Sequence, residues 1–360
     1  MSQCLNPDCL HQNPPQTKFC QRCGSRLLLG DRYRAVGLLG QGGFGRTWKA
    51  IDLHRLDSPC VIKQFLPLQQ GSGAVKKATQ LFRQEAMRLR DLGKHPQIPD
   101  LLAFVGQEEK LYLVQEFIEG KTLRQEVEKG GRFSEDRVRK VLADLLPVLD
   151  FIHQHQVIHR DIKPDNIMRS PSGSLFLIDF GVSKQTSASI LSQIGTVTGT
   201  PGYAPMEQVR GIVYPSSDLY SLGVTCIRLL TGCLPIEKNG SLADELFDHR
   251  RLRWVWREQL QNQSQTISAI LDAALDKLLQ DLPEARYQNA SEVMADLERD
   301  GQTQKVGELK GSDKPAKEEK LLAVAKKLQS NLQEKEKAIA ELKKTSKNTG
   351  DAASGFARLF

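Results

Sequence analysis

The stretch "VIHRDIKPDN", residues 157–166, gathers two basic side chains, two carboxylates, an amide and a proline within one short segment. One residue separates it from the preceding stretch "SEDRVRKVLADLLPVLDFIHQH", in which Ser134 is a suitable N-cap and apolar residues recur with helical spacing at 138, 141, 142, 145, 148 and 149. Charges placed next to an apolar helix must be paired or must bind a ligand, because a buried unpaired charge is costly.

Composition indicates a globular protein that can bury a sizeable core, since 39% of the 360 residues are hydrophobic and 26% are charged. The start "MSQCLNPDC" has no basic segment followed by an apolar one, and no run of about 18 apolar residues occurs. We therefore expect no membrane span and a cytoplasmic protein. The net charge of +7 does not predict a nucleic-acid partner, because the C-terminal lysines are interspersed with acids.

The order of patterns predicts an α+β protein. Strand-like runs come first, at 33–40, 46–52, 59–65 and 110–117, and helical patterns dominate afterwards. This order favours a small sheet-rich lobe followed by a larger helical lobe, in a domain that we place at residues 33–299. Residues 1–28 are rich in Cys, Pro and Asn and need a metal ion or disulfides to hold a shape.

Beyond this domain we expect a linker at 300–316, a charged helix at 317–345 and a flexible tail at 346–360. Apolar residues at 321, 325, 328, 332, 339 and 342 follow coiled-coil spacing, which Lys335 interrupts. A solitary charged helix and a helix that dimerises or docks a partner protein both fit this pattern, so the oligomeric state is not predicted.

The stretch "LLGQGGFGRTWKAID" contains Gly40, Gly42 and Gly45 in a G-x-G-x-x-G array between two strand-like runs. Glycines allow backbone N–H groups to approach phosphate oxygens closely. Taken alone, the array also fits an ordinary hairpin. A dinucleotide-binding turn would lead into a helix, whereas "RTWKAID" continues as a strand.

Lys63 lies in the apolar strand-like run "CVIKQF", where a buried ammonium requires an anion. Glu85, in the helix-like run "ATQLFRQEAMRLRDL", is the natural partner. The alternative is that Lys63 extends from an edge strand to solvent and that Glu85 lies on the surface.

The set of motifs resembles the signature of the protein kinase family, in order and at the family spacing. Residues 159–166 read H-R-D-x-K-x-x-N, and "LFLIDFG" places D-F-G at 179–181. The resemblance implies a bilobal protein-kinase fold and transfer of the γ-phosphoryl group of ATP to protein hydroxyls, with Mg²⁺ or Mn²⁺. A lysine at position 163 is typical of kinases directed at Ser and Thr.

The resemblance also implies the site residues. Lys63, held by Glu85, would anchor the α- and β-phosphates, Asp161 would accept the proton of the substrate hydroxyl, and Lys163 would steady the transferred phosphate. Asn166 and Asp179 resemble the Mg²⁺ ligands. The residues expected around ATP are Leu39, Gly40, Gln41, Gly42, Gly43, Phe44, Gly45, Thr47, Val61, Lys63, Glu116, Ile118 and Met168.

Further family matches imply structural contacts. Thr200 in "GTPGYAPMEQ" would contact the catalytic loop, Glu207 would pair with Arg286, and Asp218 would tether the backbone of the catalytic loop. Two positions depart from the family pattern, because Thr47 replaces a valine above adenine and Met206 replaces a proline before Glu207.

Neither departure removes a charged catalytic group, so we favour an active kinase over an ATP-binding pseudokinase scaffold. In the activation segment, the resemblance implies that Thr196 or Thr198 is autophosphorylated and that Arg160 contributes to a pocket for the phosphate.

Cys4, Cys9, Cys20 and Cys23 form the pattern C-x4-C-x10-C-x2-C, which Gly24 follows. The C-x2-C-G turn is typical of a tetrahedral Zn²⁺ site, which we favour over disulfides or free thiols. The module resembles the zinc ribbons at the N-termini of some bacterial Ser/Thr kinases, including cyanobacterial ones. It could bind a partner protein or a nucleic acid, or act as a redox sensor. A zinc-ribbon interaction protein is the second alternative function.

Overall fold

The computed structural model describes residues 1–308, apart from residues 43–44, 67–71, 181–199 and 239–240. Residues 1–298 form one unit and residues 299–360 a second. The four-cysteine module, which we expected as a separate segment at residues 1–28, therefore belongs to the same unit as the lobes described below. Within the described residues, no helix is both long and apolar enough to cross a bilayer.

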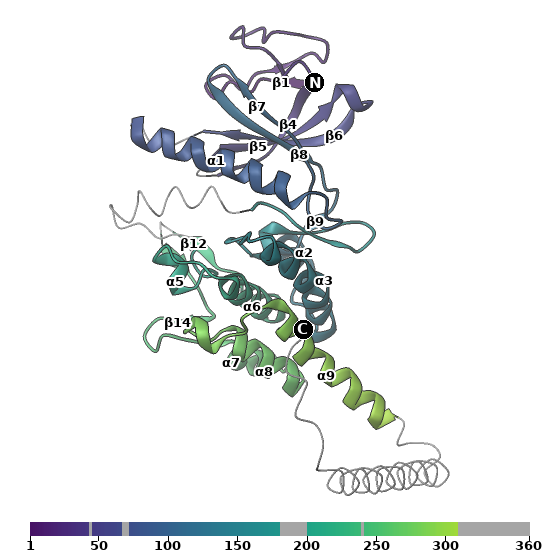
Figure 1. Cartoon of the computed structure of the whole chain (residues 1–360), viewed down its shortest axis with the longest axis vertical. Coiled ribbons are helices and arrows are strands. Elements are labelled where there is room, and N and C mark those ends of the chain that lie inside the picture. Colours follow the sequence, from purple (N-terminus) through teal and green to yellow (C-terminus); the bar gives the residue numbers. More distant parts are fainter. Residues whose placement is uncertain (43–44, 67–71, 181–199, 239–240, 309–360) are drawn as a thin grey trace, which may run out of the picture. The chain divides into compact units, whose positions relative to one another are not determined.

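A six-stranded antiparallel sheet forms the first lobe (Figure 1). Four of its strands are the ones that the sequence predicts, whereas β7 and the short β3 carry no clear alternation and were missed. The strands, in their order across the sheet, are β3 (Leu28–Leu29), β4 (Tyr33–Gly42), β5 (Gly45–Asp52), β6 (Ser58–Phe65), β8 (Lys110–Glu116) and β7 (Leu101–Gln107).

Alternation along β6 gives the sheet two faces with different roles. Ile62 and Gln64 point to the face that the N-terminal module covers, where Gln64 donates to the backbone oxygen of Leu5. Lys63 and Phe65 point to the other face, where the Phe65 ring stacks on Phe82 of α1 (Ser72–Leu92) at 5.0 Å. The lysine singled out from the sequence therefore lies on the side of the sheet that faces α1.

Helices dominate the second lobe (Figure 1). The predicted helix is α3 (Glu135–Gln154), and Ser134 caps it by accepting a hydrogen bond from the backbone N–H of Arg137. The central α6 (Pro215–Thr231) is buried along almost its whole length. The other helices of this lobe are α2 (Leu123–Gly130), α5 (Met206–Val209), α7 (Trp256–Asn262), α8 (Ala269–Leu278) and α9 (Ala290–Glu308), with the 3-10 turns η2 (Pro164–Asn166) and η4 (Pro283–Ala285). Its short strands are β9 (Lys121–Thr122), β10 (Ile167–Arg169), β11 (Leu175–Leu177), β12 (Ile236–Lys238), β13 (Ser241–Ala243), β14 (Phe247–Asp248) and β15 (Arg253–Trp254). The N-terminal module contains β1 (Ser2–Gln3) and β2 (Gln12–Asn13), and the 3-10 turn η1 (Leu53–Arg55) connects β5 to β6.

The C-terminal boundary differs from the expected one. Helix α9 continues to Glu308, so residues 300–308, which we expected to be linker, are helical. The rest of that linker, the charged helix expected at 317–345 and the tail at 346–360 lie outside the described residues and stay predictions.

One buried ion pair joins α5 to the segment that follows α8. Arg286 donates to both carboxylate oxygens of Glu207, at 2.6 and 3.1 Å, as the family resemblance predicts. Burial by itself would raise the pKa of Glu207, but the hydrogen bonds from Arg286 and Ser217 lower it. Both partners are largely buried, since the side chain of Arg286 is 1% exposed and that of Glu207 is 11% exposed.

We therefore expect Arg286→Met to destabilise the protein by about 3–5 kcal/mol, because it leaves the buried Glu207 carboxylate without its partner. The matched control is Arg253→Met, which removes an ion pair to Glu258 whose side chains are 47% and 46% exposed. The control should cost less than about 1 kcal/mol. Urea unfolding followed by tryptophan fluorescence measures both, and equal midpoints for the two variants would contradict the prediction.

Candidate active site

A buried carboxylate holds the catalytic loop. Asp218, at the start of α6, accepts hydrogen bonds from the backbone N–H groups of His159 and Arg160, both at 2.8 Å. The ring of His153 lies 2.9 Å from the same carboxylate. These contacts stabilise the backbone of Arg160 in a left-handed conformation, with φ of 71°, that residues other than glycine rarely adopt. The predicted tether between Asp218 and the loop is present.

Asp161 lies at the centre of a compact polar cluster. Its carboxylate accepts from Asn166 Nδ2 at 2.7 Å and from the hydroxyl of Thr200 at 2.5 Å, and Lys163 Nζ lies 3.3 Å away. The ammonium of Lys163 also donates to Thr200 Oγ1 at 3.0 Å. Thr200 therefore links the segment after the activation loop to the catalytic loop, as the resemblance predicts.

Lys63 reaches across from the sheet to the helical lobe. Its ammonium lies 2.5 Å from the carboxylate of Asp179. Desolvation by itself would raise the pKa of Asp179, but the charge of Lys63 and its hydrogen bond outweigh this effect and the pKa is lowered. The negative charge of Asp161 also acts on Asp179, in the raising direction. The side chains of 63, 161 and 179 therefore share one site.

Phe180 anchors the segment that carries Asp179. Its side chain is buried, and its ring packs on the His159 ring with centroids 4.7 Å apart. Burial lowers the pKa of His159, so its imidazole is neutral near pH 7, and its Nε2 lies 3.1 Å from the Ile178 oxygen. His159 thus contacts the residues immediately before and after Asp179, the predicted metal ligand.

The β4–β5 hairpin brings the glycine-rich stretch to the same region. Gly42 pairs with Gly45, and Thr47 pairs with Lys63 on β6. Gly45 has φ of 152°, and a Cβ there would lie 1.8 Å from the backbone oxygen of Gln64, so no other residue fits. Leu39, Gly40 and Gln41 lie on β4, whereas Gly43 and Phe44 are outside the described residues.

The candidate adenine-binding residues lie on both lobes. Val61 precedes Lys63 by two positions on β6 and so shares its face. Glu116 ends β8, Ile118 is buried two residues later, and the half-buried Met168 lies on β10. Their joint contact with a nucleotide stays a prediction.

Two expectations fall on groups that are not described. Glu85 belongs to α1, but its side chain is outside the described part of the structure, so its pairing with Lys63 stays a prediction. Thr196 and Thr198 also lie outside the described residues.

The four predicted cysteines converge. Their sulfur atoms all lie within 4.8 Å of one another, with 3.6 Å between Cys4 and Cys23 and 3.7 Å between Cys9 and Cys20. Tetrahedral zinc with Zn–S bonds of about 2.3 Å requires sulfurs about 3.8 Å apart, so these distances fit one ion. All four are free thiols, which does not favour the disulfide alternative.

Neighbouring groups support the cysteine cluster. The side-chain amide of Asn13 donates to Cys20 Sγ at 3.6 Å, and that of Asn6 donates to Cys23 Sγ at 3.7 Å. Such donors stabilise metal-bound thiolates. Gly24 completes the turn with φ of 75°, which favours glycine.

The loop between Cys4 and Cys9 docks onto the sheet through residues that sequence reasoning missed. Leu5 is buried in the apolar cluster of the sheet, and Gln64 Nε2 donates to its backbone oxygen at 2.6 Å. Arg46, next to Gly45, donates to the backbone oxygen of Pro7 at 3.2 Å and to Gln41 Oε1 at 3.0 Å. The one available signal was a glutamine inside the apolar run "CVIKQF".

Comparisons with known proteins agree with this geometry. The family model described as "Protein kinase domain" matches residues 33–296. The chain therefore belongs to the protein kinase family. A solved structure titled "PpkA-294 apo form" matches with a TM-score of 0.59 and 26% identity, over 74% of this chain and 96% of that one.

Several curated relatives come from cyanobacteria. "Serine/threonine-protein kinase B" of Synechocystis sp. is 39% identical over 83% of this chain and 52% of its own length. "Serine/threonine-protein kinase F" of the same organism is 41% identical over 81% of this chain and 60% of its own. "Serine/threonine-protein kinase PknA" of Nostoc sp. is 39% identical over 75% of this chain and 48% of its own. The chain thus spans about half of each relative.

The cysteine geometry predicts about one zinc ion per chain in protein purified without added metal. Cys20→Ser should lose that zinc, because a hydroxyl is a much poorer ligand than a thiolate. Cys233→Ser, at a half-buried cysteine outside the cluster, should retain it. Elemental analysis by mass spectrometry gives the metal content, and equal zinc in the two variants would contradict the assignment.

Proposed function

We propose that the chain is an ATP-dependent protein kinase that transfers the γ-phosphoryl group to Ser and Thr hydroxyls of proteins. The observation that carries the proposal is the meeting of Lys63, Asp161 and Asp179 in one site, with Lys63 2.5 Å from Asp179. The names of the relatives and the lysine at position 163 support Ser/Thr specificity.

The residues fit a divalent cation, Mg²⁺ or Mn²⁺, which would offset the phosphate charge when bound. Asp179 offers a carboxylate on a side chain that is 48% exposed. Asn166 uses its amide nitrogen to donate to Asp161, which leaves the amide oxygen for a cation. Both groups are hard oxygen donors, the kind that these ions prefer.

The remaining steps follow from the charges in the site. The ammonium of Lys63 is positioned to hold the α- and β-phosphates of ATP, because Asp179 anchors it beside the catalytic loop. Asp161 orients the substrate hydroxyl and accepts its proton as that oxygen bonds to the γ-phosphorus and the bond to ADP breaks. Lys163, next to Asp161, stabilises charge on the transferred group.

The surroundings of Arg160 support control by phosphorylation of the activation segment. Burial and the charge of Arg88 lower the pKa of Arg160 to about 10, and Arg160 Nε is buried with no hydrogen-bond partner among the described residues. Two guanidinium groups that repel each other form a place where a phosphate would be stabilising. We propose that phosphorylated Thr196 or Thr198 binds there.

The four-cysteine module is proposed to hold structural Zn²⁺ and to support the sheet through Leu5 and Gln64. Cytoplasmic localisation is part of the same proposal. Every charged catalytic position is filled, and the charged side chains described at the site are in contact, so nothing favours the pseudokinase alternative. A partner bound through the module or the C-terminal helix stays a proposal.

The activity proposal predicts that Asp161→Asn and Lys63→Met each lower transfer of the γ-phosphate to a generic basic protein by at least about a thousandfold, because they remove the proton acceptor and a phosphate anchor. Lys94→Met removes the same charge at a side chain that is 90% exposed and should retain activity. Radiolabelled ATP provides the measurement, and equal labelling by all of these forms would overturn the proposal.

Autophosphorylation predicts that wild-type protein incubated with ATP and Mg²⁺ carries phosphate on Thr196 or Thr198, whereas Asp161→Asn does not. Peptide mass spectrometry before and after phosphatase treatment identifies the positions. Active protein in which both threonines are unmodified would contradict the prediction that phosphorylation of Thr196 or Thr198 controls the activity.

A further inference from the structure

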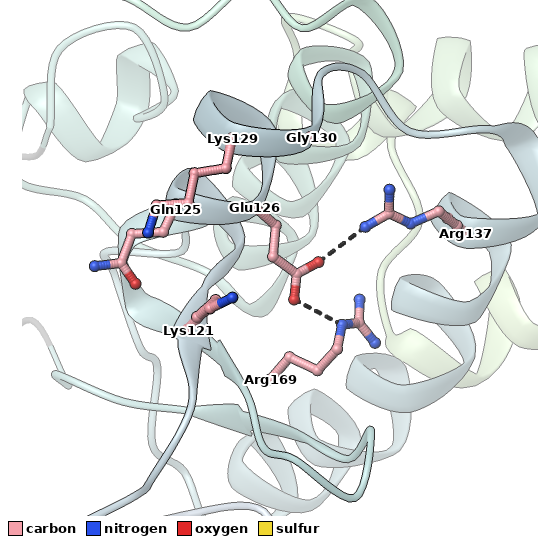
Figure 2. A pocket seen from close by; sticks show the side chains of 7 residues that line it. All are labelled: Lys121, Gln125, Glu126, Lys129, Gly130, Arg137 and Arg169. Carbon is pink, nitrogen blue, oxygen red and sulfur yellow. Dashed lines mark hydrogen bonds and ion pairs between the residues drawn. The ribbon is translucent and has the colours of Figure 1, made fainter.

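A basic cavity of about 590 Å³ lies on the helical lobe and is lined by residues that have no role in the site described above (Figure 2). It lies between α2, β9, β10 and the first turn of α3. Four of its lining residues are cations and one is an acid. The lining residues are Lys121, Gln125, Glu126, Lys129, Gly130, Arg137 and Arg169.

The single acid, Glu126, does not neutralise the four cations, but it fixes the positions of two of them. Glu126 Oε1 accepts from Arg169 Nε and Oε2 accepts from Arg137, both at 2.9 Å, so one carboxylate holds two guanidinium groups. Figure 2 shows both arginines pointing toward Glu126 from separate elements. Arg137 is further held 3.6 Å above the Phe133 ring. Four cations and one carboxylate leave three positive charges around the cavity.

Strand pairing places two of these four cations next to each other. Lys121 on β9 lies directly opposite Arg169 on β10 in the antiparallel pair. Like charges in this arrangement destabilise a sheet, so an anion between them would be stabilising. Within the described residues, neither Lys121 nor Lys129 has an ion-pair partner. Their ammonium groups therefore remain available to a ligand.

We infer that this cavity binds the phosphate group of a phosphorylated Ser or Thr in a protein segment. A phosphate dianion matches ordered guanidinium groups through paired hydrogen bonds. The cavity is several times larger than a phosphate group and leaves room for neighbouring residues of a peptide. This inference rests on the proposed function, because a Ser/Thr kinase itself produces the ligand.

The position of α2 favours a second copy of the chain as the source of that segment. Arg124 on α2 pairs with Asp165 of the catalytic loop at 2.7 Å, while Glu126 and Lys129 of the same helix line the cavity. A segment bound here is held on the lobe that carries Asp161. The region 309–360 does not suit the cavity, because it contains more Lys and Arg than Asp and Glu.

The test is fluorescence anisotropy with the full chain and no ATP. The probe is a labelled peptide with the sequence of residues 183–195 and phosphoserine at position 189, which is not one of the threonines assigned to the Arg160 pocket, compared with the unmodified peptide. We expect at least about tenfold tighter binding of the phosphopeptide, and about a tenfold loss when Lys121→Ala and Lys129→Ala are combined. Lys18→Ala with Lys94→Ala removes the same charge elsewhere and should bind like wild type.

Equal binding of the two peptides, or full binding by the Lys121 and Lys129 double variant, would overturn the inference. Competition by inorganic phosphate at the same concentration as the phosphopeptide would identify a free anion as the ligand and also overturn it. So would lysine-dependent binding to phosphatidylserine vesicles without phosphopeptide binding. Because no turnover is measured, an inactive chain that still binds the phosphopeptide would contradict only the proposed function.

Discussion

The buried carboxylate of Asp218 is the constraint on which the site depends. It is fully buried, so it must be paired, and it accepts hydrogen bonds from the backbone of His159 and Arg160. Its helix, α6, is buried along almost its whole length and gives the carboxylate a fixed position. The loop backbone is thereby set, and with it the direction in which Asp161 points. A fully buried side chain thus positions the loop that carries the proposed catalytic residue.

Charges in the site are satisfied by one another. Lys63 pairs with Asp179, and Lys163 contacts both Asp161 and Thr200. These pairs keep cations and carboxylates within a few ångströms of one another. An incoming phosphate group therefore meets lysine ammonium groups, and an incoming divalent cation meets carboxylates, so each ligand finds charges of the opposite sign. The half-exposed side chain of Asp179 lies on the solvent-accessible side of this arrangement.

The N-terminal module completes the sheet on the opposite face. Leu5 is buried in the apolar cluster, and the buried side chain of Gln64 donates a hydrogen bond to the backbone oxygen of Leu5. Gln64 neighbours Lys63, and Arg46 neighbours Gly45, so the cysteine loop contacts the strands that carry the phosphate-binding candidates. Whatever holds the four sulfur atoms together therefore also supports those strands.

Local patterns were enough to predict the catalytic loop, α3 with its Ser134 cap, four of the sheet strands and the four-cysteine cluster, because each depends on spacing within one stretch of chain. Tertiary structure alone decided the rest. The basic cavity draws Lys121, Arg137 and Arg169 from three elements, Gln64 meets Leu5 across 59 positions, and β7 is recognisable as a strand only beside β8. No periodicity encodes such contacts, since they depend on which remote surfaces pack together.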